Sequence, residues 1–209
     1  MEGFFVTGTD TNIGKTVLSA LIVAALDAVY WKPIQTGATE GKDRETVIRL
    51  AGIAAAQTRA ECYLFDPPVS PHLAARWAGA SIALEKVRRP ELPPGTPLVA
   101  EGAGGVMVPI NETQFMTDLM RYLELPVVVA ARSTLGTINH TLLTLAQLDR
   151  EGIETRGVVL IGPESSDNRE AIERYGHHPV IGVIPWLDPI NREALLTVFR
   201  EKFDSQAFQ

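Results

Sequence analysis

The sequence is poor in cysteine and has no long apolar run. Cys62 is the single cysteine among 209 residues, so an intramolecular disulfide is excluded. No stretch reaches the roughly 18 consecutive apolar residues that a membrane-spanning helix requires, and the first residues lack the charged start of a secretory signal. These absences argue against a disulfide scaffold and an integral membrane protein, and they predict a cytoplasmic location.

Clusters of basic residues are also lacking. The net charge is -6, from 19 Lys and Arg residues against 25 Asp and Glu residues, and the basic residues form no run. Such a chain has no long-range attraction for nucleic acid or for an anionic membrane. With 45% hydrophobic residues it can bury a sizeable core, and its length predicts one domain over residues 1–209 that acts on small molecules.

Hydrophobic periodicity predicts a three-layer α/β fold with a mostly parallel sheet. Apolar runs with the length of buried strands occupy residues 3–7, 28–32, 97–100, 126–131, 157–161 and 180–184. Helical spacing is clearest at residues 15–26, 139–150 and 191–203. Strands that alternate with helices form parallel sheets, whose ligands bind at the carboxyl ends of the strands. The polar segments 36–43 and 102–113 follow strand ends, so we expect them at the site.

The segment GTDTNIGKT at residues 8–16 has the composition of a phosphate-binding loop. Glycines let backbone N–H groups approach a phosphate, and the following helix adds its positive dipole end. Lys15 is placed to reach the β- and γ-phosphates, and the Thr16 hydroxyl to contact magnesium. The spacing is a variant, because Thr9 stands where a regular loop has its first glycine. We predict a P-loop NTPase-like domain whose nucleotide site contains Gly8, Thr9, Asp10, Thr11, Asn12, Ile13, Gly14, Lys15 and Thr16.

A magnesium-nucleotide site also needs carboxylates. Glu101 ends an apolar strand, and three glycines among the next four residues leave room for a ligand. A carboxylate there is unfavourable unless it is paired or metal-bound, although a strand-end Glu could also cap a neighbouring helix. Asp43 is a second candidate. From the residue pattern alone, N-capping of a helix explains Asp43 equally well.

Lys32 ends the second predicted strand, directly before Pro33. In a parallel sheet this position lies at the same edge as the phosphate loop. A solvated strand-end lysine is the ordinary alternative. Two lysines facing one phosphate, however, are what stabilisation of a transferring phosphoryl group requires, so we interpret Lys15 and Lys32 as catalytic.

The chain contains, in this order, the motifs GTDTNIGKT, KPIQTG, SPHLAA, EGAGGVMVPI, LGTINH and GVIPWL. Together they resemble the dethiobiotin synthetase family, and the resemblance extends from the first predicted strand to the last sixth of the chain. It implies a homodimeric P-loop enzyme that converts 7,8-diaminononanoate, CO2 and MgATP to dethiobiotin, ADP and phosphate. The implied route runs through a carbamate and a carbamic-phosphoric anhydride.

The resemblance also implies roles for the matching residues. Magnesium would be held by Thr16, Asp43 and Glu101, which favours the metal role of Asp43 over capping. The carbamate would contact Thr11, Lys32 and Thr36, and Thr11 would join the two lysines in catalysis.

Two further parts of the site follow from the same resemblance. The other subunit would supply a helix start that binds the distal carboxylate of the substrate, at Gly136, Thr137, Ile138 and Asn139. Side-chain capping by Thr134 or Thr137 explains that helix start without a ligand. The nucleobase would lie near Pro185 and Trp186.

The sequence departs from the family pattern at two positions. Ile161 stands where the family usually has an asparagine that reads the adenine edge. An isoleucine offers no hydrogen bond, so we expect looser base selection that admits other triphosphates such as CTP or GTP, or a base site made differently. Asn12 replaces a residue that is often acidic in the family, and we assign it no role.

A switch ATPase of the partitioning or cell-division type is the main alternative. Such proteins share the fold and the phosphate loop, but they usually carry an extra lysine four residues before the second glycine, where this chain has Asp10. They also tend to have a membrane or DNA surface, and no basic amphipathic helix is found here.

Overall fold

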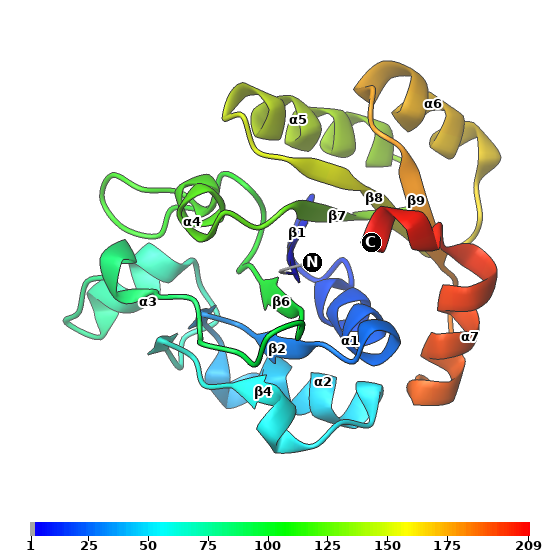
Figure 1. The fold of residues 1–209 in the computed structure, drawn as a ribbon. Coiled ribbons are helices and arrows are strands. Elements are labelled where there is room, and N and C mark those ends of the chain that lie inside the picture. The colour runs from blue at the N-terminus through cyan, green and yellow to red at the C-terminus, as the bar shows by residue number, and fades with distance from the viewer. Residues whose placement is uncertain (1–2) are drawn as a thin grey trace.

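The computed structural model describes residues 3–209, which form a central sheet covered by helices on both faces (Figure 1). The strands pair in parallel in the order β4-β2-β6-β1-β7-β8-β9. Their bounds are Gly3–Gly8 for β1, Val29–Trp31 for β2, Thr58–Arg59 for β4, Leu98–Glu101 for β6, Val127–Arg132 for β7, Thr155–Ile161 for β8 and Val180–Ile184 for β9. A small second sheet pairs β3 (Ile34–Gln35) with β5 (Tyr63–Leu64). The predicted parallel α/β fold and its six strands are confirmed.

The helices divide into two groups, one on each face of the sheet (Figure 1). One apolar cluster contains residues of α1 (Lys15–Leu26), α2 (Asp43–Ala51) and α7 (Arg192–Lys202). The other contains residues of α3 (Pro71–Trp77), α4 (Met116–Leu123), α5 (Thr137–Arg150) and α6 (Ser166–Gly176). Among the helices of residues 3–209, none is long and apolar enough to cross a membrane.

Helix α1 is apolar around most of its circumference because it lies between the sheet and two other helices. Its sequence, KTVLSALIVAAL, places Leu18, Leu21 and Ile22 in the core without solvent exposure. Truncation of such a residue, for example Leu21→Ala, costs about 2–5 kcal/mol of stability because a cavity remains. The helix therefore holds the phosphate loop firmly at its amino end.

Parallel pairing gathers residues that are distant in the sequence at one edge of the sheet. β1 lies between β6 and β7, and its Val6 is in register with Glu101. β2 lies on the other side of β6, so Lys32, which follows β2, comes to the same edge. β8 and β9 continue this edge toward Ile161 and Pro185. The predicted site residues that follow these strands thus lie along one edge of the sheet, because all these strands run in one direction.

Candidate active site

The phosphate loop closes tightly at the start of α1. Gly14 caps the helix with a φ of 98°, and a Cβ at Gly14 would lie 2.8 Å from Cδ1 of Ile161. Gly105, in the loop after β6, approaches the phosphate loop so closely that a Cβ there would lie 3.2 Å from the Gly8 carbonyl oxygen. The left-handed backbone at Gly14 therefore favours glycine, and a side chain at Gly105 would crowd the phosphate loop. Asn12 adopts a φ of 55°, which asparagine tolerates better than most residues.

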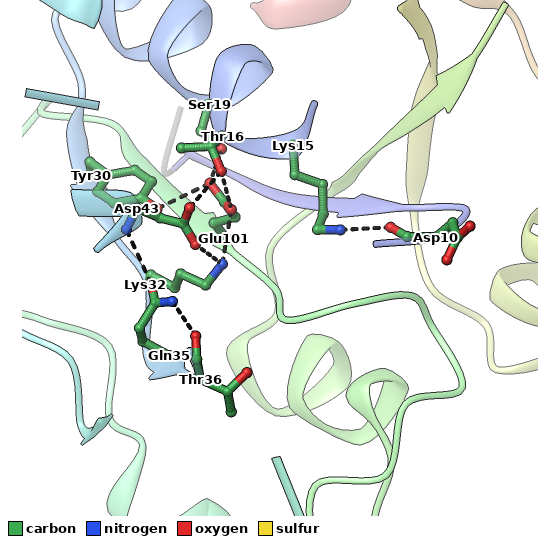
Figure 2. A network of polar contacts seen from close by, with 10 residues as sticks. All are labelled: Asp10, Lys15, Thr16, Ser19, Tyr30, Lys32, Gln35, Thr36, Asp43 and Glu101. Atoms are coloured by element: carbon green, nitrogen blue, oxygen red, sulfur yellow. Dashed lines mark hydrogen bonds and ion pairs between the residues drawn. The ribbon is translucent and has the colours of Figure 1, made fainter. Parts of the chain in front are cut away.

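Lys15 is folded back onto its own loop. Its ammonium donates a hydrogen bond of 2.7 Å to the Asp10 carbonyl (Figure 2). The Asp10 carboxylate accepts a hydrogen bond from the Thr11 N–H at 2.7 Å and pairs with Arg132 at 3.2 Å. These contacts order the phosphate loop around the Lys15 ammonium.

Lys32, Asp43 and Glu101 form a charged cluster beside the loop (Figure 2). Lys32 Nζ pairs with Asp43 Oδ2 and lies 3.0 Å from Glu101 Oε1. Thr16 Oγ1 lies 2.9 Å from Asp43 Oδ1 and 3.1 Å from Glu101 Oε1. The structure therefore brings together Lys32, Thr16 and both predicted carboxylates. Helix α2 is capped by Lys42 rather than by Asp43, so the capping alternative for Asp43 is wrong.

The second oxygen of Glu101 has its own partners. Glu101 Oε2 accepts hydrogen bonds from Ser19 Oγ at 2.8 Å and from Tyr30 Oη at 3.0 Å. Sequence reasoning missed both residues, although signals existed. Ser19 follows Thr16 by three residues on a helix, and Tyr30 precedes Lys32 by two residues along an extended strand, so each shares a face with a predicted site residue. Within residues 3–209 the hydrogen bonds that Glu101 accepts come from side chains, so helix capping by Glu101 is not observed.

Burial and the mutual field of these groups set their protonation. Burial lowers the pKa of Lys15 to about 8, and the charge of Lys32 adds to this effect, against the attraction of Glu101. Burial would also lower the pKa of Lys32, but the Glu101 and Asp43 carboxylates outweigh it and raise that pKa. Burial opposes ionisation of Asp43, yet Lys32 brings the pKa of Asp43 below its usual range. Lys32 and Asp43 are therefore an ion pair at neutral pH.

The oxygen donors of the cluster suit magnesium. In residues 3–209 no group of three or more His, Cys, Asp or Glu side chains is arranged to hold a metal ion, so a buried all-protein cage is absent from this region. The Thr16 hydroxyl and the Asp43 and Glu101 carboxylates converge instead. Mg²⁺ is commonly held by one or two carboxylates together with substrate phosphates and water, and this donor set fits that pattern.

The predicted carbamate contacts come from two different segments of the chain. Thr11 is exposed on the phosphate loop, and Thr36 directly follows β3. Gln35 connects Thr36 to the cluster, because its Nε2 donates to the Thr36 carbonyl at 2.6 Å and its Oε1 accepts from the Asp43 N–H at 3.3 Å (Figure 2). The part played by Thr11 and Thr36 in substrate binding stays a prediction.

The start of α5 lies beside the phosphate loop of the same chain. Gly136 caps α5 with a φ of 92°, and no side chain caps the helix, so capping by Thr134 or Thr137 is not observed. Thr137 lines a small hollow of about 30 Å³ together with Thr9 and Asp10 of the loop. Anion binding by Gly136, Thr137, Ile138 and Asn139 stays a prediction, as does its supply by a second subunit.

Pro185 and Trp186 follow β9, which is separated from the charged cluster at the ends of β2 and β6 by β1, β7 and β8. They line an open groove of about 530 Å³ between the loop after β9 and helix α7. Trp186 is 74% exposed, and a Cβ at Gly162 would lie 3.5 Å from its Cζ2 atom. Ile161 covers Gly14 of the phosphate loop. Apolar groups thus connect the loop to the groove where a base is expected.

The fold and this edge of the sheet define a P-loop NTPase-like protein. A sequence model described as an AAA domain matches residues 2–194. A ParA family ATPase from Chlorobium tepidum TLS shares the fold, with a TM-score of 0.57 at 12% identity over 96% of this chain and 91% of that one. The cell division ATPase MinD of Pyrococcus furiosus also shares it, with a TM-score of 0.54 at 17% identity over 94% of this chain and 88% of that one.

Curated relatives narrow the class to one family. The ATP-dependent dethiobiotin synthetase BioD of Paramagnetospirillum magneticum is 52% identical over 88% of both chains, and that of Novosphingobium aromaticivorans is 41% identical over the full length of both. The biotin biosynthesis bifunctional protein BioCD of Bordetella avium is 47% identical over 93% of this chain, which spans 42% of that longer protein. The chain belongs to the dethiobiotin synthetase family, an enzyme family, as its motifs predict.

Proposed function

We propose that this chain uses ATP to close the ureido ring of dethiobiotin from 7,8-diaminononanoate and CO2. The observation that carries the proposal is the cluster in which Lys32 pairs with Asp43 and Glu101 beside the phosphate loop. Family membership supports the assignment of these substrates, because the named relatives are ATP-dependent dethiobiotin synthetases. Residues 1–209 act as one domain in this proposal.

The reaction begins with a carbamate. One substrate amine adds to CO2 and loses a proton, and a carbamate oxygen then attacks the γ-phosphorus of ATP and expels ADP. The second amine attacks the carbonyl carbon of the resulting carbamic-phosphoric anhydride, which closes the ring and expels phosphate. No covalent bond to the protein is needed, so catalysis consists of positioning and charge stabilisation.

Lys15 and Lys32 supply the positive charge for phosphoryl transfer. In the proposal Lys15 leaves the Asp10 carbonyl for the β- and γ-phosphates, while Lys32 orients the carbamate and stabilises charge on the transferred group. Thr11 and Thr36 hold the carbamate. Because Lys32 is anchored by carboxylates on two other elements, its ammonium is held at a fixed place before substrate arrives, which avoids an ordering cost during the reaction.

Thr16, Asp43 and Glu101 are the proposed magnesium ligands. When bound, Mg²⁺ supplies positive charge that offsets the charge developing on the phosphate oxygens. The protein's part is to hold three oxygen donors at one place and to keep them there through the contacts of Figure 2.

The remaining parts of the proposed site bind the distal carboxylate of the diaminononanoate and the base of ATP. The amino end of α5, at Gly136, Thr137, Ile138 and Asn139, binds the distal carboxylate through free N–H groups, in a homodimer whose site lies at the interface. Pro185 and Trp186 contact the nucleobase.

The proposal is tested by the coupling of ATP consumption to ring formation. Purified protein is incubated with ATP, magnesium and bicarbonate, with and without 7,8-diaminononanoate, and ADP and dethiobiotin are quantified. The proposal predicts equal amounts of both products and little ADP when the diamine is omitted. ADP formation that ignores the diamine, and responds instead to protein concentration or nucleic acid, would replace the proposal with a switch ATPase, whose fold this chain shares.

A further inference from the structure

We propose that Ser19 and Tyr30 are positioning residues that make Glu101 a single-oxygen ligand and so favour Mg²⁺ over Ca²⁺ at the active site. This inference rests on the proposed role of Glu101 as a metal ligand. It assigns a task to two hydroxyl groups that contact neither nucleotide nor substrate in the proposed mechanism.

The two oxygens of Glu101 face different surroundings. Oε1 faces the site, where it lies 3.1 Å from Thr16 Oγ1 and 3.0 Å from Lys32 Nζ. Oε2 faces the interior and accepts hydrogen bonds from Ser19 at 2.8 Å and Tyr30 at 3.0 Å. Figure 2 shows Ser19 and Tyr30 approaching the carboxylate from α1 and β2. Two separate elements therefore fix the rotation of one carboxylate.

Both hydroxyl groups are suited to a permanent positioning role. Ser19 and Tyr30 have no solvent exposure, so water does not compete for Glu101 Oε2. Hydrogen bonds to a charged acceptor are stronger than bonds between neutral groups, and two of them occupy Oε2.

The presentation of one oxygen affects cation choice. Mg²⁺ requires a compact octahedral shell and is satisfied by single carboxylate oxygens, whereas Ca²⁺ takes more ligands and readily binds both oxygens of a carboxylate. Since Ser19 and Tyr30 hold Oε2 away from the site, Glu101 can offer only Oε1. Removal of either hydroxyl frees the carboxylate to rotate and present both oxygens.

The test compares Tyr30→Phe and Ser19→Ala with the parent in the full chain. Binding of a non-hydrolysable ATP analogue is titrated with Mg²⁺ and, separately, with Ca²⁺, so that no turnover is needed. Loss of a residue that orients a metal ligand typically weakens metal affinity about 10–100-fold. We expect the half-saturating Mg²⁺ concentration to rise by about tenfold in each variant, and the Ca²⁺ value to rise less, so that the preference for Mg²⁺ falls.

Three controls separate the outcomes. Tyr63→Phe also removes a hydrogen-bonded tyrosine hydroxyl, but this hydroxyl bonds to the backbone of Ala83 and not to Glu101. This variant should leave both titrations unchanged. Glu101→Gln tests the proposed function itself, because an unchanged Mg²⁺ titration would remove Glu101 from the metal site. Thermal unfolding identifies a variant that fails to fold. If Tyr30→Phe does not fold, Ser19→Ala decides.

The inference is overturned in either of two ways. One is that Glu101→Gln changes the Mg²⁺ titration while Ser19→Ala and Tyr30→Phe do not. The other is that both variants weaken Mg²⁺ and Ca²⁺ equally, since loss of general order at the site would do this without any change in how Glu101 presents its oxygens.

Discussion

Lys32 Nζ lies 3.0 Å from Glu101 Oε1, and the two residues are only 6% and 1% exposed. Asp43 completes the arrangement on the other side of the ammonium. One buried cation thus holds two carboxylates together, so each partner depends on the others. Removing one member of a buried ion pair typically costs about 3–5 kcal/mol, because an uncompensated charge remains.

Lys32→Met is therefore expected to destabilise the protein by about 3–5 kcal/mol in the absence of metal. Addition of magnesium with ATP should recover more stability in this variant than in the parent, because a bound cation replaces the missing positive charge. Chemical denaturation with and without ligand measures both effects. Lys202→Met is the matched control, since Lys202 pairs with Glu164 at an exposed site where such pairs contribute about 0–1 kcal/mol. A loss as small as that of the control would contradict the account of the cluster.

Lys15→Ala should remove catalysis while leaving the fold intact. The Lys15 ammonium donates to the Asp10 carbonyl within its own loop. Its side chain is buried, so the variant loses some packing, but alanine favours the helix that begins at this position. Removal of one group that stabilises transition-state charge typically lowers kcat by about 10²–10³-fold. Steady-state kinetics and thermal unfolding together check this result. Turnover close to that of the parent would show that the phosphate loop is assigned wrongly.

The pKa of Lys15, about 8 in the free protein, predicts that nucleotide binding depends on pH. A bound phosphate favours the ammonium form and raises this pKa, so binding above pH 8 takes up a proton. Affinity for ATP without magnesium should therefore be constant well below pH 8 and should fall by up to about tenfold per pH unit above it. Calorimetry in two buffers with different ionisation enthalpies measures the proton directly. The same pH dependence in Lys15→Ala would assign the proton to another group.

Ile161 predicts weak selection among nucleobases. Its side chain covers Gly14 and carries no polar group, and an apolar contact typically discriminates by only about 10–200-fold. The parent should therefore turn over CTP and GTP within about a hundredfold of ATP in kcat/KM. Ile161→Asn should widen the gap in favour of ATP. A steep ATP preference in the parent would mean that backbone groups near Pro185 and Trp186 read the base.

Most of the fold follows from the sequence because its central strands are buried on both faces. Such strands appear as unbroken apolar runs, and each predicted run became a strand. The edge strand β4 has only two residues, Thr58 and Arg59, too few to show any period. Helix α6 was not predicted, because Ile172 is its only buried residue and the helix therefore has no apolar stripe. Its start at Ser165, whose hydroxyl accepts from the Asn168 N–H, was the available signal.

Site residues were predictable from the sequence where the backbone fixes their position, at the phosphate loop and at strand ends. They were less predictable where the role depends on which side chains lie nearby. Lys15 and Thr16 follow from the loop, and Lys32 and Glu101 from their strand ends. Asp43 was undecided from the residues alone, because a helix start explains an aspartate as well as a cation does. The structure removes the capping explanation, because Lys42 is the N-cap residue of α2, and it places Asp43 beside Thr16 and Lys32.

The most direct measurement follows an oxygen atom from CO2 through the reaction. The protein is given ATP, magnesium, 7,8-diaminononanoate and ¹⁸O-labelled bicarbonate, and mass spectrometry records the organic product, the phosphate and the label left in the bicarbonate. The account predicts dethiobiotin together with phosphate that carries one ¹⁸O atom, because the carbamate oxygen that attacks ATP leaves with the phosphate. Dethiobiotin with unlabelled phosphate, while the bicarbonate stays labelled, would contradict the phosphorylated carbamate, and absence of dethiobiotin would contradict the proposed function.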